Sequence, residues 1–238
     1  MTASSLWYTD LLQSRGATPP DGLLSVLRQA IHERFEPRAG AIVEAIAAGF
    51  DTPHVLSRFL LAHSESERAG GHVIGAVAGR PEAEPFRDVL IAHAVDEERH
   101  DRMLEALCRQ VDPGAPEARP DHQAENEAFL DAYDGDLANF VCDVHVAEIR
   151  SYYFLAAYIQ AAGRSSARYA PKIKACFEEI LRDEENHISY TAALIGRWHA
   201  ADPGLEQSIR RAAGLYATLI DRKLDGLRAI AAQEGVQA

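Results

Sequence analysis

The sequence predicts an all-α protein, a four-helix bundle with additional helices before and after it. Apolar residues recur at helical spacing in one segment after another, and no segment shows the alternating pattern of a strand. In addition, a D-E-x-x-H motif occurs twice, at 96–100 and at 183–187, each time in the middle of a helical segment. We expect a single domain over 1–238, with the bundle at about 53–200 and accessory helices at about 21–49 and 205–233.

Composition and charge restrict the partners of the protein. The formal net charge of −12 argues against nucleic acid, because phosphate binding needs clustered Lys and Arg. No apolar run approaches the length of a membrane span, and the first residues lack the regions of a signal peptide. Cys108, Cys142 and Cys176 have no zinc-like spacing. We therefore expect reduced thiols, no membrane and a cytoplasmic location.

Two packing helices are predicted before residue 50. Leu23, Leu27 and Ile31 recur at helical spacing over 21–35. Pro37, just after this segment, interrupts the pattern. A second apolar run continues from there to Gly49.

Four long helices are predicted between residues 53 and 200. Thr52 and Pro53 supply a cap and a first-turn proline for the first of them. A short loop joins the first helix to the second, and another joins the third to the fourth, so each pair should be antiparallel. The polar crossover between the pairs is expected to hold one short helix, around Phe129, Leu130 and Tyr133. The four helices are expected at about 53–79, 86–110, 137–162 and 171–200.

Charged residues interrupt the apolar stripe of each bundle helix. Glu67 and Glu148 stand in the first and third helices, whereas the second and fourth carry a Glu and a His three residues apart. Such a pair projects from one face of a helix and can bind the same metal ion. The predicted metal ligands are Glu67, Glu97, His100, Glu148, Glu184 and His187.

Four carboxylates inside a bundle need cationic partners. Unpaired, their burial would exceed the usual net stability of a domain, about 5–15 kcal/mol. Two divalent ions would balance the four charges, and mixed Glu and His ligation suits iron, with manganese as the alternative. Asp96 and Asp183 precede the two motif glutamates and are expected to accept hydrogen bonds from His187 and His100 across the bundle. The plainer interpretation makes both of them surface residues.

The motifs resemble those of the ferritin-like diiron-carboxylate proteins. The segment from Asp96 to His100 is similar to the D-E-x-R-H motif of their oxygenase branch, and the second copy differs by Asn186 in the Arg place. The resemblance covers roughly residues 53–200 and implies a ferritin-like fold. It also implies a non-heme dinuclear iron oxidoreductase that activates dioxygen to oxidise a small organic substrate, by hydroxylation, N-oxygenation, desaturation or C–C cleavage. Expected partners are that substrate, dioxygen and an electron donor, and a homodimer is left open.

Other functions fit the same ligands. A ferroxidase or peroxide-scavenging, iron-handling protein is one alternative, although storage ferritins are usually shorter and lack the early helices. A heme-oxygenase-like diiron oxidase is another, but it would place a His at position 180, where this chain has Ile180. A non-catalytic scaffold would leave the motifs on a solvated surface, which their position within the apolar stripes argues against.

Several neighbours of these ligands have open roles. Glu65 is an alternative to Glu67, but it lies in line with Arg58 and Arg68 rather than with the apolar stripe. His63 and His93 each stand one turn before a ligand Glu. His93 is kept as an extra ligand, because its spacing to Glu97 and His100 resembles the extra-His pattern of N-oxygenating relatives, which carry the third His on the last helix. For both residues, a hydrogen-bonded core histidine is the plainer interpretation.

Two further positions could take part in chemistry. Tyr152, one turn after Glu148, is the candidate catalytic residue, as a radical or hydrogen-bonding group, with core packing as the plainer alternative. Arg150 could bind a substrate carboxylate. Gly70 and Gly71 could leave room for a substrate beside the ligands, or only allow the helices to pack closely.

Overall fold

Long helices make up most of the described chain, which in this computed structural model comprises residues 6–115, 130 and 133–235. The all-α class is confirmed, because these residues form helices and no strand. Within this part of the chain, no helix is both long and apolar enough to cross a membrane. The elements are α1 (Leu6–Ser14), α2 (Asp21–Arg34), α3 (Glu36–Phe50), α4 (Pro53–Ala78), the 3-10 helix η1 (Pro81–Phe86), α5 (Arg87–Val111), α7 (Leu137–Arg164), α8 (Ala170–His199) and α9 (Leu205–Gln233).

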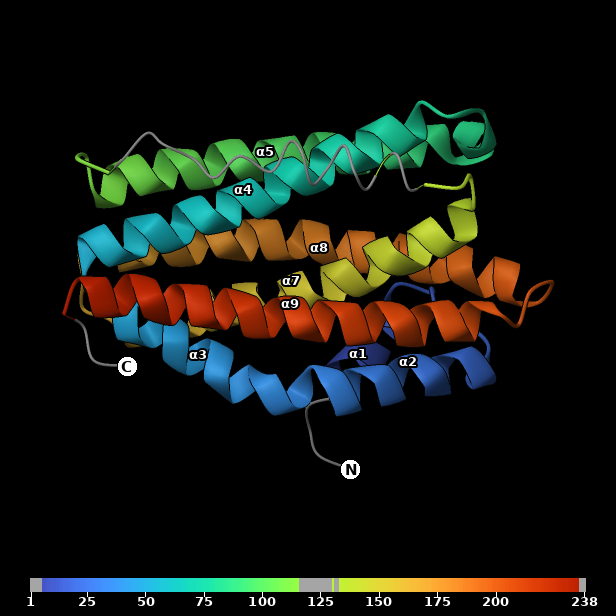
Figure 1. Cartoon of the computed structure of the whole chain (residues 1–238), viewed down its shortest axis with the longest axis horizontal. Coiled ribbons are helices and arrows are strands. Elements are labelled where there is room, and N and C mark those ends of the chain that lie inside the picture. Colours follow the sequence, from blue (N-terminus) through green and yellow to red (C-terminus); the bar gives the residue numbers. More distant parts are fainter. Residues whose placement is uncertain (1–5, 116–129, 131–132, 236–238) are drawn as a thin grey trace.

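The centre of the molecule is a bundle of four long helices. Helix α4 packs along α5, and α7 packs along α8, in each case as antiparallel neighbours (Figure 1). Contacts between α5 and α8 join the two pairs. This arrangement agrees with the predicted pairing of the four helices.

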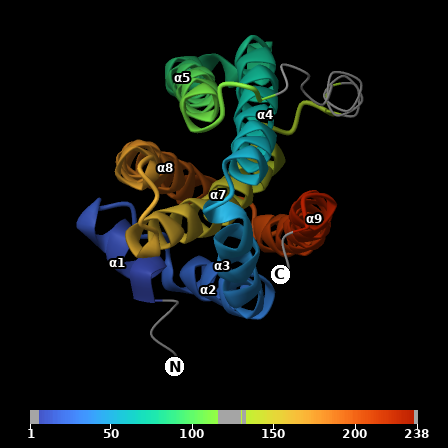
Figure 2. The same ribbon diagram turned by 90° about the vertical axis from the view of Figure 1, so that its left-hand side faces the viewer.

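The accessory helices form a further layer beside the bundle. Helices α3 and α9 pack against α7, and α2 packs against both of them (Figure 2). Helix α1, which packs against α8, was not expected from the sequence. Its Tyr8 and Leu12 are fully buried, so this short helix belongs to the core despite its weak sequence pattern.

Local sequence explains where the bundle helices begin and how closely they approach. Pro53 occupies the first turn of α4, and the Asp136 side chain caps α7 by accepting a hydrogen bond from the Asn139 backbone N–H at 3.0 Å. At Gly71, a Cβ atom would lie 2.9 Å from Glu97 Cβ, so glycine allows α4 and α5 to pack closely at this point.

Differences from the expected elements are small. The loop expected over 80–85 is the 3-10 helix η1, and α7 continues one residue past Gly163, to Arg164. The short helix expected around Phe129 falls largely outside the described residues. All three cysteines are free thiols.

Candidate metal centre

Buried carboxylates and imidazoles from all four bundle helices meet in two overlapping groups. In each group, the potential ligand atoms lie within 4.8 Å of one another. Glu97 belongs to both groups, and every member is buried. The structure thus brings together the six predicted ligands and adds His93. The first group is His93, Glu97, Glu148 and His187, and the second is Glu67, Glu97, His100 and Glu184.

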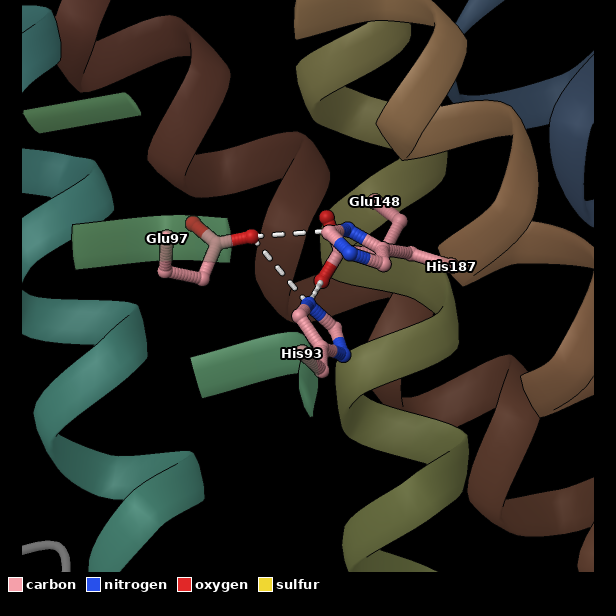
Figure 3. Close-up of side chains that lie close together, drawn as sticks. All are labelled: His93, Glu97, Glu148 and His187. Carbon is pink, nitrogen blue, oxygen red and sulfur yellow. Dashed lines mark hydrogen bonds and ion pairs between the residues drawn. The ribbon is translucent and has the colours of Figure 1, made fainter. Parts of the chain in front are cut away.

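The side chains of the first group point toward one another between α5, α7 and α8 (Figure 3). His93 Nε2 lies 3.1 Å from Glu97 Oε1 and 3.1 Å from Glu148 Oε1. His187 Nδ1 lies 3.5 Å from the same oxygen of Glu97. The rings of His93 and His187 stack with their centroids 3.6 Å apart. Three helices therefore aim two nitrogens and two carboxylates at one small volume.

A carboxylate of the second group, that of Glu184, also approaches the first group. His100 Nδ1 lies 3.4 Å from Glu67 Oε2 and 3.4 Å from Glu184 Oε1. The other oxygen of Glu184 lies 3.3 Å from His187 Nδ1 in the first group. Glu184 therefore faces both groups with different oxygens, which is the arrangement of a carboxylate that can bridge two cations.

Unsatisfied polar atoms indicate that a cation fits between these side chains. His100 Nδ1 and Glu184 Oε1 are buried and have no hydrogen-bond partner within the described part of the chain, although they lie 3.4 Å apart. Two buried polar atoms this close that make no hydrogen bond are costly, and a metal ion between them would bind the lone pair of a neutral imidazole and that of the carboxylate. The donor set, carboxylate and imidazole without thiolate, fits iron or manganese.

Without a metal ion, bound protons balance part of the negative charge of the clustered glutamates. Burial lowers the pKa of His100, but the Glu184 and Glu67 carboxylates outweigh this effect and raise it to about 11. Burial likewise opposes the protonation of His187, and Asp96 and Glu184 raise its pKa to about 10. Burial and the charge of Glu67 raise the pKa of Glu97 well above its usual range. These raised pKa values show that the glutamates create an excess of negative charge within the cluster.

Carboxylates outside the two groups orient the histidines, as expected from the sequence. His100 Nε2 lies 3.3 Å from Asp183 Oδ2, and His187 Nε2 lies 3.5 Å from Asp96 Oδ2. Each Asp thus contacts the His of the other motif and leaves Nδ1 of that ring facing the glutamates. Arg99, which was not predicted to take part, donates to Asp183 at 2.7 Å and to Asp96 at 3.0 Å.

The tyrosine that is hydrogen-bonded to a ligand residue is Tyr190 and not the expected Tyr152. Tyr152 stacks on Trp7, with ring centroids 3.8 Å apart, and is hydrogen-bonded to none of the residues of the two groups among the described residues. Tyr190 instead reaches the site, because its hydroxyl is hydrogen-bonded to His93 Nδ1 at 2.7 Å. The sequence signal for Tyr190 was its position one helical turn after His187, on the same face of α8.

Glu67, rather than Glu65, supplies the carboxylate from α4. Glu65 belongs to neither ligand group and pairs with Arg68 at 2.5 Å. His63 Nε2 lies 3.0 Å from Glu67 Oε1, but His63 belongs to neither group and is surrounded by aromatic rings. These are the rings of Phe154, Tyr158 and Phe177.

A cavity of about 400 Å³ adjoins the ligands. Glu67, Glu97 and Glu148 form part of its wall, so it connects directly with both groups. Gly70 also lines it, so this glycine leaves space beside the ligands. Such a volume lies within the range of small-molecule sites, about 300–1,000 Å³.

Comparisons with known proteins do not assign a function. No protein family, no curated protein and no solved structure matches the chain. A helical bundle can host many functions, so the function has to follow from the chemistry of the site.

Proposed function

We propose that this protein is a ferritin-like oxidoreductase that binds two iron ions within its bundle and uses dioxygen to oxidise a small organic molecule. One observation carries the proposal: two buried ligand groups share Glu97 and adjoin a cavity large enough for a small molecule. A surface scaffold would not need these buried charges, because their desolvation is costly without a cation.

The proposed ligands divide between two ions. Glu67 and His100 would hold one ion, whereas Glu148, His187 and His93 would hold the other. Glu97 and Glu184 would bridge them, because both face the two groups. His93 is included because its Nε2 faces the glutamates while its Nδ1 is hydrogen-bonded to Tyr190.

The chain itself would orient the ligands and exclude water. Bound ferrous iron would supply the electrons that reduce dioxygen. Asp96 and Asp183 would hold His187 and His100 in one tautomer, and Arg99 would fix both aspartates. Burial of the glutamates would keep bulk water away from the reacting groups.

The cavity favours oxidation of an organic molecule over iron handling. A ferroxidase needs a route for ions but no apolar chamber beside its metals. Here Val73, Ile74, Val144 and Leu219 line the space next to the glutamates. These walls suit a partly apolar substrate.

Dioxygen uptake by the ferrous-loaded protein tests this proposal. We expect slow uptake without substrate and faster uptake with one member of a panel of amino acids, fatty acids and aromatic compounds, with an oxidised product found by mass spectrometry. Uptake that depends only on excess ferrous ion would select the ferroxidase instead. A protein that retains no iron would refute both functions.

A further inference from the structure

Arg150 brings a positive charge into the cavity beside the proposed metal centre. It lies two residues after Glu148 on α7, and it is the one basic side chain among the described residues that line the cavity. Its guanidinium lies 5.3 Å from the centroid of the Tyr216 ring. It forms no hydrogen bond or ion pair with any other residue that the structure describes. Its donors are therefore available to a ligand.

A second basic side chain lies beside the cavity wall. Lys223 Nζ is 3.3 Å from the hydroxyl of Ser66, which lines the cavity, and 4.8 Å from the Phe154 ring centroid. Burial among neighbouring atoms lowers the pKa of Lys223 to about 7, and the charge of Arg150 adds to this effect. Lys223 is therefore only partly protonated at neutral pH, and Arg150 remains the permanent positive charge on this cavity.

The acidic residues of the cavity do not neutralise Arg150 once metal is bound. Glu67, Glu97 and Glu148 are proposed metal ligands, and two divalent ions would balance their charge. Asp143, the other acidic residue lining the cavity, pairs with Arg211 at 3.5 Å. The metal-loaded cavity would thus combine apolar walls with one unpaired guanidinium.

We propose that the cavity binds a small apolar carboxylic acid, with its carboxylate on Arg150 and its hydrocarbon part between α4, α7 and α9. A guanidinium presents two parallel N–H donors that match the two oxygens of a carboxylate. Val73, Val144 and Leu219, one from each of these helices, supply the apolar contacts. This inference rests on the proposed function, since it names the substrate class of that site.

Matched acids and amides test the inference by binding rather than by turnover. Octanoate and octanamide, and 4-phenylbutanoate and 4-phenylbutanamide, are titrated calorimetrically into manganese-loaded protein whose metal content is measured. We expect the acid of a pair to bind about ten-fold more tightly than its amide, as one charge-assisted contact provides. Arg150→Gln should remove this preference, Arg150→Lys should restore part of it, and Arg102→Gln, a control at a side chain 64% exposed and outside the cavity wall, should retain it.

The outcomes separate this inference from the proposed function. Failure of both acids to bind, equal binding of acid and amide, or a preference that survives Arg150→Gln would overturn the inference. The last result would place the carboxylate on the metal. Two metal ions per chain without acid preference would leave the proposed function in place. An Arg150-dependent preference in a protein that takes up no metal would support the acid site and refute the function.

Discussion

Among single residues, Glu97 matters most for the proposed metal centre, because it is the side chain common to both ligand groups. Glu97→Ala should therefore abolish binding of both ions rather than halve it. Metal analysis after anaerobic loading and dialysis measures this loss. Glu98→Ala is the matched control, since the neighbouring Glu98 is 64% exposed and pairs with Arg102 at 3.7 Å. Full metal content in the Glu97 variant would contradict the assignment.

The buried side chain of His145 should make the free energy of unfolding depend on pH. It is fully buried, with Nε2 2.9 Å from the Tyr8 hydroxyl and Nδ1 2.8 Å from Thr191 Oγ1. Burial lowers the pKa of His145 to about 3. Between about pH 6.5 and pH 3 the unfolded chain therefore binds a proton that the native protein does not, and the free energy of unfolding falls as the pH falls through this window.

His145→Gln should reduce this acid sensitivity, because glutamine does not titrate. Urea unfolding of the metal-free proteins at pH 7 and pH 4 should show a smaller loss of stability in the variant, by about 2–4 kcal/mol. His72→Gln, at an exposed position, serves as the control. Parallel losses in the wild type and in His145→Gln would refute the role of this histidine.

At the element scale, the approach of α4 to α5 depends on one glycine. At Gly71, an added Cβ would lie 2.9 Å from Glu97 Cβ and 3.2 Å from the Ala94 carbonyl oxygen, whereas at Gly75 it would meet Ala94 Cβ at 3.6 Å. Gly71→Ala should destabilise the protein by about 1–3 kcal/mol and weaken metal binding, because it pushes Glu97 aside.

Gly75→Ala, one turn along the same helix, is the matched comparison. It should raise the free energy of unfolding by up to about 1 kcal/mol, because alanine is the better helix former and meets only ordinary contacts. Urea unfolding measures both variants. Equal effects of the two substitutions would show that close packing at residue 71 does not matter.

Element positions could be predicted because helical periodicity is a local property of the sequence. The period places Glu97 and His100 on one face of α5, and the same period places His93 there too, at the spacing i, i+4, i+7. The plainer interpretation of His93 as a core residue was favoured because periodicity cannot distinguish a buried ligand from a buried hydrogen-bonding group. Helix α1 was missed because its nine residues show little amphipathic pattern.

In the whole molecule, the contacts between segments that are distant in the sequence could not be predicted from helical periodicity. Tyr152 was placed near the ligands by its distance from Glu148 along α7, but Trp7 from α1 stacks on it. The neighbours of Arg150 come from α9, some seventy residues later in the chain. Packing against remote helices, rather than helical spacing, decides which side chains face the cavity.

The spread of the ligands over four helices predicts that metal and folding are linked. An ion that binds only the native arrangement stabilises it by an amount that grows with its concentration, about 2.7 kcal/mol at a hundredfold excess over Kd. Manganese or anaerobic ferrous ion should therefore raise the midpoint of urea unfolding, and a chelator should reverse the shift. A midpoint that does not respond to metal would argue against a site built from α4, α5, α7 and α8.

Anomalous diffraction from crystals of the iron-loaded protein would locate the two metal ions proposed between these helices. Two anomalous peaks are expected at the iron edge, one beside Glu67 and His100 and the other beside Glu148 and His187, with Glu97 contacting both. A peak at only one of these positions, or iron bound elsewhere on the protein, would contradict this proposal.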